Sequence, residues 1–415
     1  MPPTTDFVSE PDRSSLLRPF YPALDGLRAI AILLIFSFHY CRLTWDVEVW
    51  RWGWVGVDLF FCLSGFLITG ILYDSLHRDD YFRNFYIRRA LRIFPLYYSF
   101  WLVLLLLTPI LHVSWSHAVL SMAFYIGNFF IAGANLHHHA DPSLVFFLSP
   151  FHGGKTHTLL INHFWSLCVE EQFYLVWPAV LWFVRSRRSL LRLCLILFTV
   201  LPIARLLYVH FQPQMFSQGM LYFNTFSRAD GLLAGAGVAL WIRGPGGSKI
   251  TLRRVALGLT IGAPLLLALS LRLEKTRPGL PMNDPVISTI GYTLVALAAA
   301  GILLLAIESS SLFTSFLQMR PLVAIGRISY GIYFYQLMLL EVVYSRDHFL
   351  FLKSHHLLVM IPVSMFLAAF VMAKLSFRFL ESPFLRLKPL LAPRPGAIND
   401  PPPDSAPVLL TPESR

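Results

Sequence analysis

Cysteine and charge are both scarce in this chain, and each shortage narrows what the protein can be. Four cysteines occur among 415 residues, and charged residues make up 14% of the chain. The cysteines lie in or beside apolar segments, and none has the C-x-x-C partner typical of a zinc or thiol-redox site. We therefore expect neither a disulfide framework nor a metal, and bound zinc plays no part in the predicted chemistry.

Two further features are missing from the sequence. Residues 1–18 are polar and contain prolines, serines and charges, so they do not form a cleavable signal peptide. The first apolar segment should then act as an uncleaved insertion signal. No internal repeat occurs at a fixed period, which weakens the case for a transporter built from inverted repeats.

Apolar residues, in contrast, are abundant. The chain is 56% hydrophobic, and its mean hydropathy is +0.59. A water-soluble chain of this size would bury such a fraction with difficulty, and apolar runs of spanning length recur throughout. The composition predicts an all-α fold, a polytopic integral membrane helical bundle whose partner is the lipid bilayer.

The apolar runs and the basic clusters together predict the topology. Eleven segments have spanning length: 23–40, 53–73, 95–113, 117–134, 164–184, 190–209, 226–242, 254–271, 286–307, 321–344 and 357–380. Basic clusters at 78–92, 185–192, 243–254 and 386–394 mark inside connections. All these clusters can lie on the inside only if an even number of membrane crossings separates each pair, so one of the eleven segments does not cross. The segment 117–134, which contains glycines and an asparagine, is the weakest candidate for a transmembrane helix. About ten transmembrane helices remain, with both termini cytoplasmic.

This topology divides the chain into three parts. Residues 1–20 form a cytoplasmic N-terminal segment, 21–388 a membrane domain, and 389–415 a proline-rich tail expected to be disordered. The segment 135–163 is then predicted to lie on the external side of the membrane. The net charge of +11 reflects basic residues beside apolar segments, which fits a multi-pass protein of the cell inner membrane and argues against a nucleic-acid partner.

The first apolar segment contains two ionisable residues, Arg28 and His39, eleven positions apart. Eleven residues of α-helix span about three turns, or roughly 16 Å, so both lie on nearly one stripe. Ionisable side chains in membrane helices normally face a bundle interior or a wet cavity. His39 is a candidate general base, or else an interfacial histidine bonded to a carbonyl or water. Arg28 is either a ligand-binding residue or a positive-inside anchor paired with Asp25.

Two adjacent carboxylates, Glu170 and Glu171, stand early in the apolar segment that follows His163. Ser166 and Glu170 share a helix face, while Glu171 points about 100° away. One glutamate can enter the bundle and orient the His39 imidazole, as the third member of a base relay does. The alternative is a carboxylate attracted to the helix N-terminus, which explains one glutamate near the first turn or two but not so long an apolar flank.

A basic cluster at Arg88, Arg89 and Arg92 follows the second span. Its i,i+3 and i,i+4 spacings place guanidinium groups on one side of a helix, an arrangement suited to phosphates. A juxtamembrane topology anchor is the commoner origin of such a cluster.

The second span carries Asp58 and Ser64 among small residues such as Gly56 and Gly65, which permit close helix packing. Asp58 requires a cation nearby if it is not functional. Arg228 begins another small-residue helix, and packing does not explain it. Six histidines crowd the predicted external segment without a fixed ligand spacing, so a metal site there has little support. These are His137, His138, His139, His152, His157 and His163.

Seven sequence blocks follow one another over roughly residues 20–385, almost the whole membrane domain. The blocks are LDGLRAIAILLIFSFH at 24–39, GVDLFFCLSGFLIT at 56–69, FYIRRALRIFPLYY at 85–98, FWSLCVEEQFYLVWP at 164–178, SRADGLLAG at 227–235, IGRISYGIYFYQ at 325–336 and LESPF at 380–384. In this order they resemble the acyltransferase-3 family of membrane O-acyltransferases, which modify O-antigens, exopolysaccharides and macrolides.

The resemblance implies transfer of an acyl group, most often acetyl, from cytoplasmic acyl-CoA to a hydroxyl of a glycan, a lipid-linked sugar or a macrolide-like molecule. It implies catalytic roles for His39, Glu170 and Glu171. Acyl-CoA is then a donor substrate, and no cofactor is bound permanently. Donor binding is assigned to Arg28, Arg88, Arg89, Arg92 and Arg228, and substrate binding to Asp58, Ser64, Trp165, Ser166, Tyr330 and Gln336.

One position departs from the family pattern, because Gln336 stands where many members have a histidine. An amide can still hydrogen-bond a substrate. We expect His39, oriented by a glutamate, to deprotonate the acceptor hydroxyl, with an acyl-histidine relay as a variant and Ser64 as a candidate oxyanion donor. The alternative function is a proton-coupled membrane transporter or glycolipid flippase that uses His39 and the glutamates as a proton relay.

Overall fold

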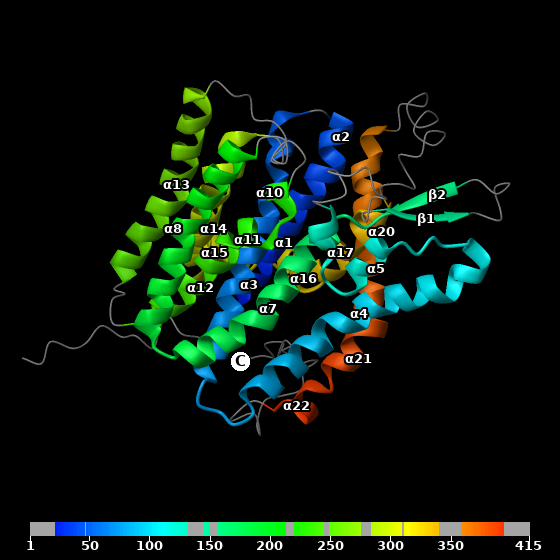
Figure 1. The fold of residues 1–415 in the computed structure, drawn as a ribbon, viewed down its shortest axis with the longest axis horizontal. Coiled ribbons are helices and arrows are strands. Elements are labelled where there is room, and N and C mark those ends of the chain that lie inside the picture. The colour runs from blue at the N-terminus through cyan, green and yellow to red at the C-terminus, as the bar shows by residue number, and fades with distance from the viewer. Residues whose placement is uncertain are drawn as a thin grey trace, which may run out of the picture.

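The computed structural model describes residues 21–45, 47–131, 144–148, 156–212, 220–244, 249–274, 284–308, 311–339 and 358–393. Helices form almost all of this part of the chain (Figure 1). The bundle helices are α1 (Pro22–Phe36), α3 (Val55–Asp74), α4 (Tyr81–Leu111), α7 (Phe164–Val184), α8 (Arg187–Phe211), α12 (Asp230–Ile242), α13 (Lys249–Leu273), α14 (Tyr292–Ile307), α16 (Arg320–Arg327), α17 (Ser329–Gln336) and α20 (Ile361–Ser376).

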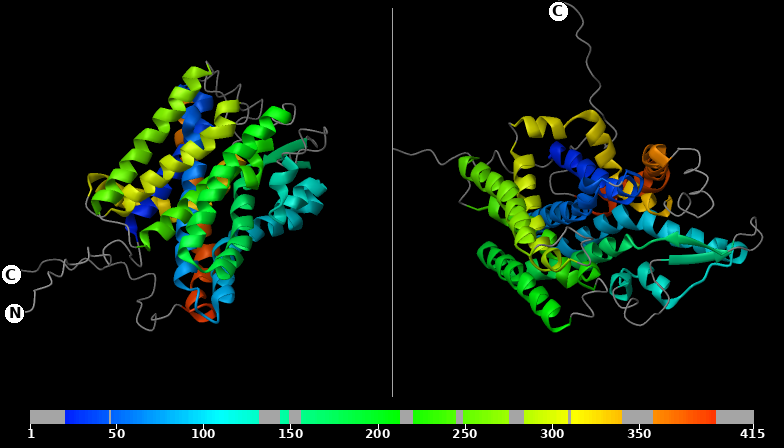
Figure 2. Two further views of the ribbon diagram at one scale, coloured as in Figure 1. Left: turned by 60° about the vertical axis from the view of Figure 1, so that its left-hand side comes forward. Right: turned by 90° about the horizontal axis from the view of Figure 1, so that it is seen from above.

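Shorter helical pieces extend or connect these helices. They are η2 (Ser37–Cys41), α2 (Arg42–Trp45), η3 (Glu48–Trp54), α5 (His117–Ala123), α10 (Met220–Phe223), α11 (Thr225–Arg228), η5 (Ile287–Gly291), α15 (Leu312–Leu317), η6 (Leu358–Met360), η7 (Phe377–Glu381), α21 (Ser382–Leu385) and α22 (Lys388–Leu391). Helices α1 and α3 run through the middle of the bundle, with α8, α12, α13 and α14 on one side and α4, α17 and α20 on the other (Figures 1 and 2).

Among the described residues, eight helices are long and apolar enough to cross a membrane. They confirm the predicted all-α polytopic membrane bundle. Two segments predicted to span are shorter: 226–242 contributes α12, of 13 residues, and 321–344 contributes α16 and α17, of eight residues each. The predicted count of about ten is reached only when α12 and the α16–α17 pair are included.

The segment 117–134 is not one continuous helix. Helix α5 ends at Ala123, and Tyr125 follows with a left-handed φ of 58°. A non-glycine residue in this region interrupts a right-handed helix. This agrees with the expectation, drawn from the basic clusters, that the segment does not cross the membrane as a helix.

One small sheet departs from the helical expectation. Strands β1 (Leu144–Leu148) and β2 (Thr156–Leu160) form an antiparallel pair in which Leu144 lies opposite Leu160. The pair falls in the segment predicted to lie outside the membrane, near the C-terminal end of α4 (Figures 1 and 2). The predicted N-terminal segment 1–20, the tail from 394 onward, and His137, His138, His139 and His152 lie outside the described residues.

Glycines bring α3 and α12 into close contact, as the small residues of the second span predicted. A Cβ added at Gly65 would lie 2.0 Å from the carbonyl oxygen of Leu232, and one at Gly235 would lie 1.9 Å from that of Cys62. No real side chain fits at such distances. The crossing therefore depends on backbone contact, the usual way in which membrane helices pack closely.

This contact gives a testable pair of variants in one helix. Gly235→Ala should force α12 away from α3 and destabilise the fold by about 1–3 kcal/mol, the usual range for overpacking. Gly237→Ala is the control, since nothing lies within 4 Å of an added Cβ there. The thermal unfolding midpoint of the detergent-solubilised protein measures both. Equal midpoints for the two variants would contradict the packing described here.

Candidate active site

Two small cavities lie side by side inside the bundle. The first, which we call the arginine chamber, has a volume of about 140 Å³ and is lined by Arg28, Ser64, Arg89, Arg92, Ser166, Glu170, Tyr330 and Tyr333. The second, the histidine chamber, has a volume of about 90 Å³ and is lined by His39, Trp54, Asn162, His163, Trp165, Tyr222 and Tyr333. Val57 and Tyr333 line both cavities, so one wall separates them.

His39 lies where the first helix changes its winding. Helix α1 runs into the π-helical turn η2, which spans Ser37–Cys41. Such turns insert an extra residue into a helix and occur often at functional sites. Arg28 lines one chamber and His39, farther along the same helix, lines the other, so both face the bundle interior.

A glutamine fixes the His39 ring. The His39 Nδ1 and Gln336 Oε1 atoms are 3.4 Å apart, and the Tyr40 hydroxyl donates to the Gln336 carbonyl oxygen at 2.5 Å. Because an amide oxygen can only accept, Nδ1 carries the proton in this contact. The Nε2 atom is then unprotonated, which is the state that a general base requires.

The two predicted glutamates lie elsewhere, which corrects the expected contact with His39. Glu170 lines the arginine chamber, and Glu171 lies 3.9 Å from Arg89. In the described part of the chain, the hydrogen-bond partner of His39 is Gln336. The reason is position along α7: Trp165 is level with His39, and Glu170 is five residues, or about 7.5 Å, farther along the helix.

A second imidazole, that of His163, lines the histidine chamber with His39. Its Nε2 lies 2.9 Å from the carbonyl oxygen of Phe334, and only 3% of the residue is exposed. Burial lowers the pKa of His163 to about 3. The ring is therefore neutral at physiological pH, with Nε2 donating to Phe334 and Nδ1 unprotonated.

The arginine chamber presents guanidinium groups with spare hydrogen-bonding capacity. The Arg89 guanidinium stacks on the Tyr174 ring, 3.7 Å from its centroid, and its Nε lies too far from Glu171 for a hydrogen bond, at 3.9 Å. Among the described residues the Arg89 Nε atom has no hydrogen-bond partner. Buried donors of this kind are normally satisfied, so Arg89 is suited to an anionic ligand.

Two more cations complete this chamber, and a third lies outside it. Arg28 pairs with Asp25 at 2.7 Å, and Arg92 lies 3.7 Å from Glu381. Arg88 instead donates to the Ala392 carbonyl oxygen at 2.7 Å and does not line the chamber. The predicted i,i+3 pair is thus brought together, whereas Arg88 turns toward the C-terminal end of the described chain.

The predicted substrate residues divide between the chambers. Trp165 lines the histidine chamber, and Ser64 and Tyr330 line the arginine chamber, where Ser64 contacts the Tyr174 hydroxyl. Ser166 Oγ lies 2.5 Å from the Tyr333 hydroxyl in the shared wall. Ser64 therefore lies in a different cavity from His39, and this position does not favour its predicted role as an oxyanion donor.

Asp58 and Arg228 bind each other, which corrects their assignment to ligands. Their side chains are 2.9 Å apart and at most 1% exposed. The Arg228 guanidinium also lies 4.0 Å from the centroid of the Tyr292 ring and is surrounded by Trp54, Trp165 and other aromatic residues. Arg228 is thus the cation that the buried Asp58 carboxylate requires. It lines neither chamber and lies apart from Arg28, Arg89 and Arg92.

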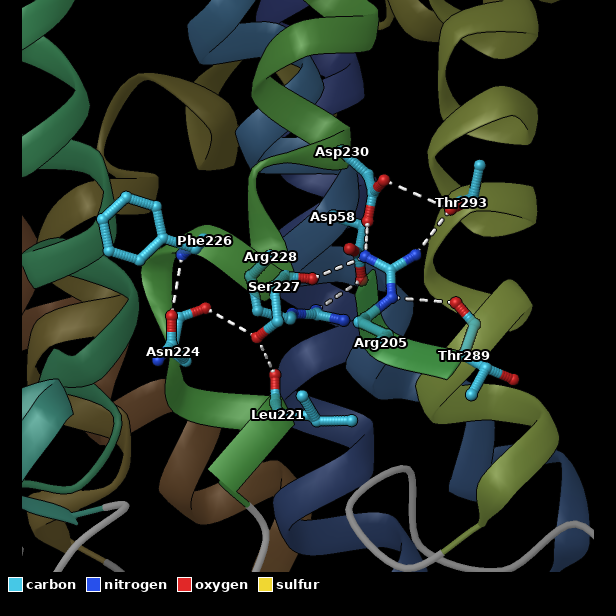
Figure 3. A network of polar contacts seen from close by, with 10 residues as sticks. All are labelled: Asp58, Arg205, Leu221, Asn224, Phe226, Ser227, Arg228, Asp230, Thr289 and Thr293. Carbon is cyan, nitrogen blue, oxygen red and sulfur yellow. Dashed lines mark hydrogen bonds and ion pairs between the residues drawn. The ribbon is translucent and has the colours of Figure 1, made fainter. Parts of the chain in front are cut away.

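A second buried ion pair adjoins the first (Figure 3). Arg205 contacts Asp230 at 2.5 Å, and it also donates to the Thr289 carbonyl oxygen and the Thr293 hydroxyl. Removing one member of such a pair leaves an unpaired buried charge, which destabilises a protein strongly. Together the pairs join α3, α8, α12 and α14 behind the histidine chamber.

A much larger cavity lies elsewhere among the described residues. It has a volume of about 1160 Å³, lies between α1, α13 and α14, and is lined mainly by leucine, isoleucine, valine and alanine. Its polar lining residues are Thr260 and Arg272. Because it contains no base, nucleophile or cluster of cations, we place the chemistry in the two smaller chambers.

Several residues of the site were not assigned a role from the sequence. They are Asn162, His163, Tyr174, Tyr222, Tyr333 and Glu381. Two signals were available. His163 directly precedes the FWSL block, and Glu381 is a carboxylate within an otherwise basic C-terminal region. The tyrosines carry no such signal, since aromatic residues are common throughout the chain.

Comparison with known proteins decides the family. Residues 21–375 match a family described as an acyltransferase domain, the type 3 acyltransferases. The chain belongs to the acyltransferase-3 family. The match includes every residue that lines either chamber of this acyltransferase-3 chain, and Glu381 lies just beyond it. No solved structure matches the chain.

Three relatives of this acyltransferase-3 chain are similar over 88% of its length. The O-acetyltransferase OatA of Staphylococcus aureus is 28% identical, and the peptidoglycan O-acetyltransferase OatA of Listeria monocytogenes is 27% identical. The putative peptidoglycan O-acetyltransferase YrhL of Bacillus subtilis is 29% identical. The matches cover 57%, 56% and 55% of these relatives, so the chain spans little more than half of their length.

Proposed function

We propose that this chain is a membrane O-acyltransferase that transfers an acyl group, acetyl in the first instance, from acyl-CoA to a hydroxyl of a glycan. The observation that carries the proposal is the pair of adjoining chambers, one rich in arginine and one containing the His39 imidazole. The printed names of the relatives support acetyl as the group and peptidoglycan as the first acceptor to test.

The donor would bind in the arginine chamber. Arg28, Arg89 and Arg92 supply guanidinium forks that match phosphate oxygens, and this chamber lies at the end of α1 that follows the N-terminus. The basic clusters predict that this end is cytoplasmic and that the protein lies in the inner membrane. Acyl-CoA would then enter the chamber from the cytoplasm. The narrow pantetheine arm then passes Val57 and Tyr333 and brings the thioester to His39.

The acyl transfer itself would use His39 as a general base. Nε2 takes the proton of the acceptor hydroxyl while the hydroxyl oxygen attacks the thioester carbonyl carbon. The C–S bond breaks, the acyl group remains on the acceptor oxygen as an ester, and the CoA thiolate takes the proton back from His39. Gln336 acts as a positioning residue, since its contact with Nδ1 fixes the ring.

One labelling experiment tests this proposal against transport. Membrane vesicles that contain the protein and the host's own glycans receive acetyl-CoA radiolabelled in the acetyl group. We expect alkali-labile label in the glycan fraction and release of one free CoA thiol per ester formed. Label that crosses the membrane as intact acetyl-CoA or glycolipid, without an ester in the glycan, would favour the transporter or flippase alternative.

A further inference from the structure

The histidine chamber contains polar atoms that the proposed reaction does not use. The Nδ1 atom of His163, the Oδ1 atom of Asn162 and the Nε2 atom of Gln336 are buried and have no hydrogen-bond partner among the described residues. His163 and Asn162 line the chamber directly, together with His39. Buried polar groups are normally hydrogen-bonded. The two unsatisfied acceptors at this cavity, with the Gln336 amide beside His39, therefore point to a ligand that satisfies them.

The surroundings of His163 fix the ring and determine what it can bind. Its Nε2 donates to Phe334, and its own carbonyl oxygen accepts from the Tyr333 hydroxyl at 2.7 Å, while the Ser166 hydroxyl donates to Tyr333 at 2.5 Å. These contacts hold both the backbone and the ring. The remaining nitrogen, Nδ1, is a neutral acceptor, and so is the Asn162 oxygen.

The chemistry that these atoms match is a second hydroxyl group. A hydroxyl has one donor hydrogen and two acceptor lone pairs, so it can donate to His163 or Asn162 and accept from the Gln336 amide. His39 Nε2 accepts a hydrogen bond from the first hydroxyl, which is the one that is acylated. A glycan carries further hydroxyl groups on the acylated sugar or on its neighbour, so one acceptor molecule can satisfy both positions, whereas an acceptor with an isolated hydroxyl leaves His163 and Asn162 unpaired.

We propose that His163 and Asn162 form an acceptor-binding site for a second hydroxyl of the glycan, beside the one that is acylated. This inference rests on the proposed function and assigns two acceptor-positioning residues to its second chamber.

Two substitutions at His163 separate binding from folding. In His163→Gln the side-chain amide nitrogen falls near the position of Nε2, so the bond to Phe334 is kept and the chamber-facing acceptor is lost. In His163→Asn the side-chain oxygen falls near the position of Nδ1, so the acceptor is kept and the bond to Phe334 is lost. The matched control is His210→Gln, at an exposed position in the last turn of α8.

The measurement uses the vesicles described above and compares glycan ester formed with CoA thiol released. We expect His163→Gln to lower ester formation about tenfold or more, the effect of one lost hydrogen bond to a buried polar group. CoA release should fall less, because water replaces the sugar as the acyl acceptor. His163→Asn should retain more ester per CoA than His163→Gln while lowering the thermal unfolding midpoint, and Asn162→Ala should resemble His163→Gln.

A purely structural role predicts the reverse order, with His163→Gln close to the wild type and His163→Asn impaired. That order would overturn the inference, as would a His163→Gln variant that loses CoA release and ester formation equally. If the wild type itself releases no CoA and forms no ester, the proposed function fails before the inference is reached. The two failures are therefore distinguishable in one assay.

Discussion

Replacing His39 with alanine should lower acyl transfer about 100- to 10,000-fold, the usual contribution of a positioned general base. The fold should survive, because His39 is only half-buried and its contact with Gln336 is a single hydrogen bond at 3.4 Å. The measurement is the rate at which label passes from acetyl-CoA to glycan in vesicles that contain equal amounts of each variant.

His210→Ala is the matched control for this experiment. It removes an exposed histidine from the last turn of α8, on a helix that lines neither chamber. Its transfer rate should equal that of the wild type. A His39→Ala variant within about threefold of the wild type would remove the general-base step from the mechanism, since such a loss is far below that range.

The double variant Arg89→Ala with Arg92→Ala should raise the KM for acetyl-CoA about 100-fold or more. Each hydrogen bond to a charged group contributes roughly 1.5–3 kcal/mol, and every 1.4 kcal/mol corresponds to a tenfold change in binding. The KM for the glycan should stay almost unchanged, because the two arginines line the chamber that does not contain His39. Initial rates measured over a range of each substrate separate the two constants.

Arg88→Ala supplies the control within the same basic cluster. This arginine carries the same charge on the same helix, but it contacts the Ala392 carbonyl oxygen and lies outside the arginine chamber. The donor KM of this variant should stay within about threefold of the wild type, since a charge outside the site is screened by solvent and salt. An equal rise in donor KM for Arg88→Ala and for the double variant would mean that the cluster attracts CoA by general charge alone.

The sequence predicted the features that depend on local spacing. Helical spacing placed Arg89 and Arg92 on one face, and the distance from Arg28 to His39 along one helix carried them to neighbouring cavities. Close packing of α3 on α12 followed from glycines within the two helices themselves. These properties are set within a few turns of one helix, so they can be deduced without knowing which helices pack together.

Partners from distant parts of the chain were predicted less well. Gln336 lies 297 positions from His39, and nothing local indicates that an amide rather than a glutamate holds the ring. Arg228 lies 170 positions from Asp58. The sequence therefore suggested a separate ligand-binding role for each residue, whereas in the structure the two charges neutralise each other. Such pairings depend on how the bundle packs, which spacing along one helix does not determine.

The tyrosine in the wall between the chambers also bears on how the two chambers stay separate at rest. The Tyr333 hydroxyl is held from two sides, by the His163 carbonyl oxygen at 2.7 Å and by Ser166 Oγ at 2.5 Å. Turning the ring aside breaks both bonds and requires about 1–3 kcal/mol in all, at roughly 0.5–1.5 kcal/mol each. That cost keeps the ring in the wall in most molecules. It is also small enough for a bound thioester arm to offset, so in the proposed reaction one side chain both closes the wall and admits the donor.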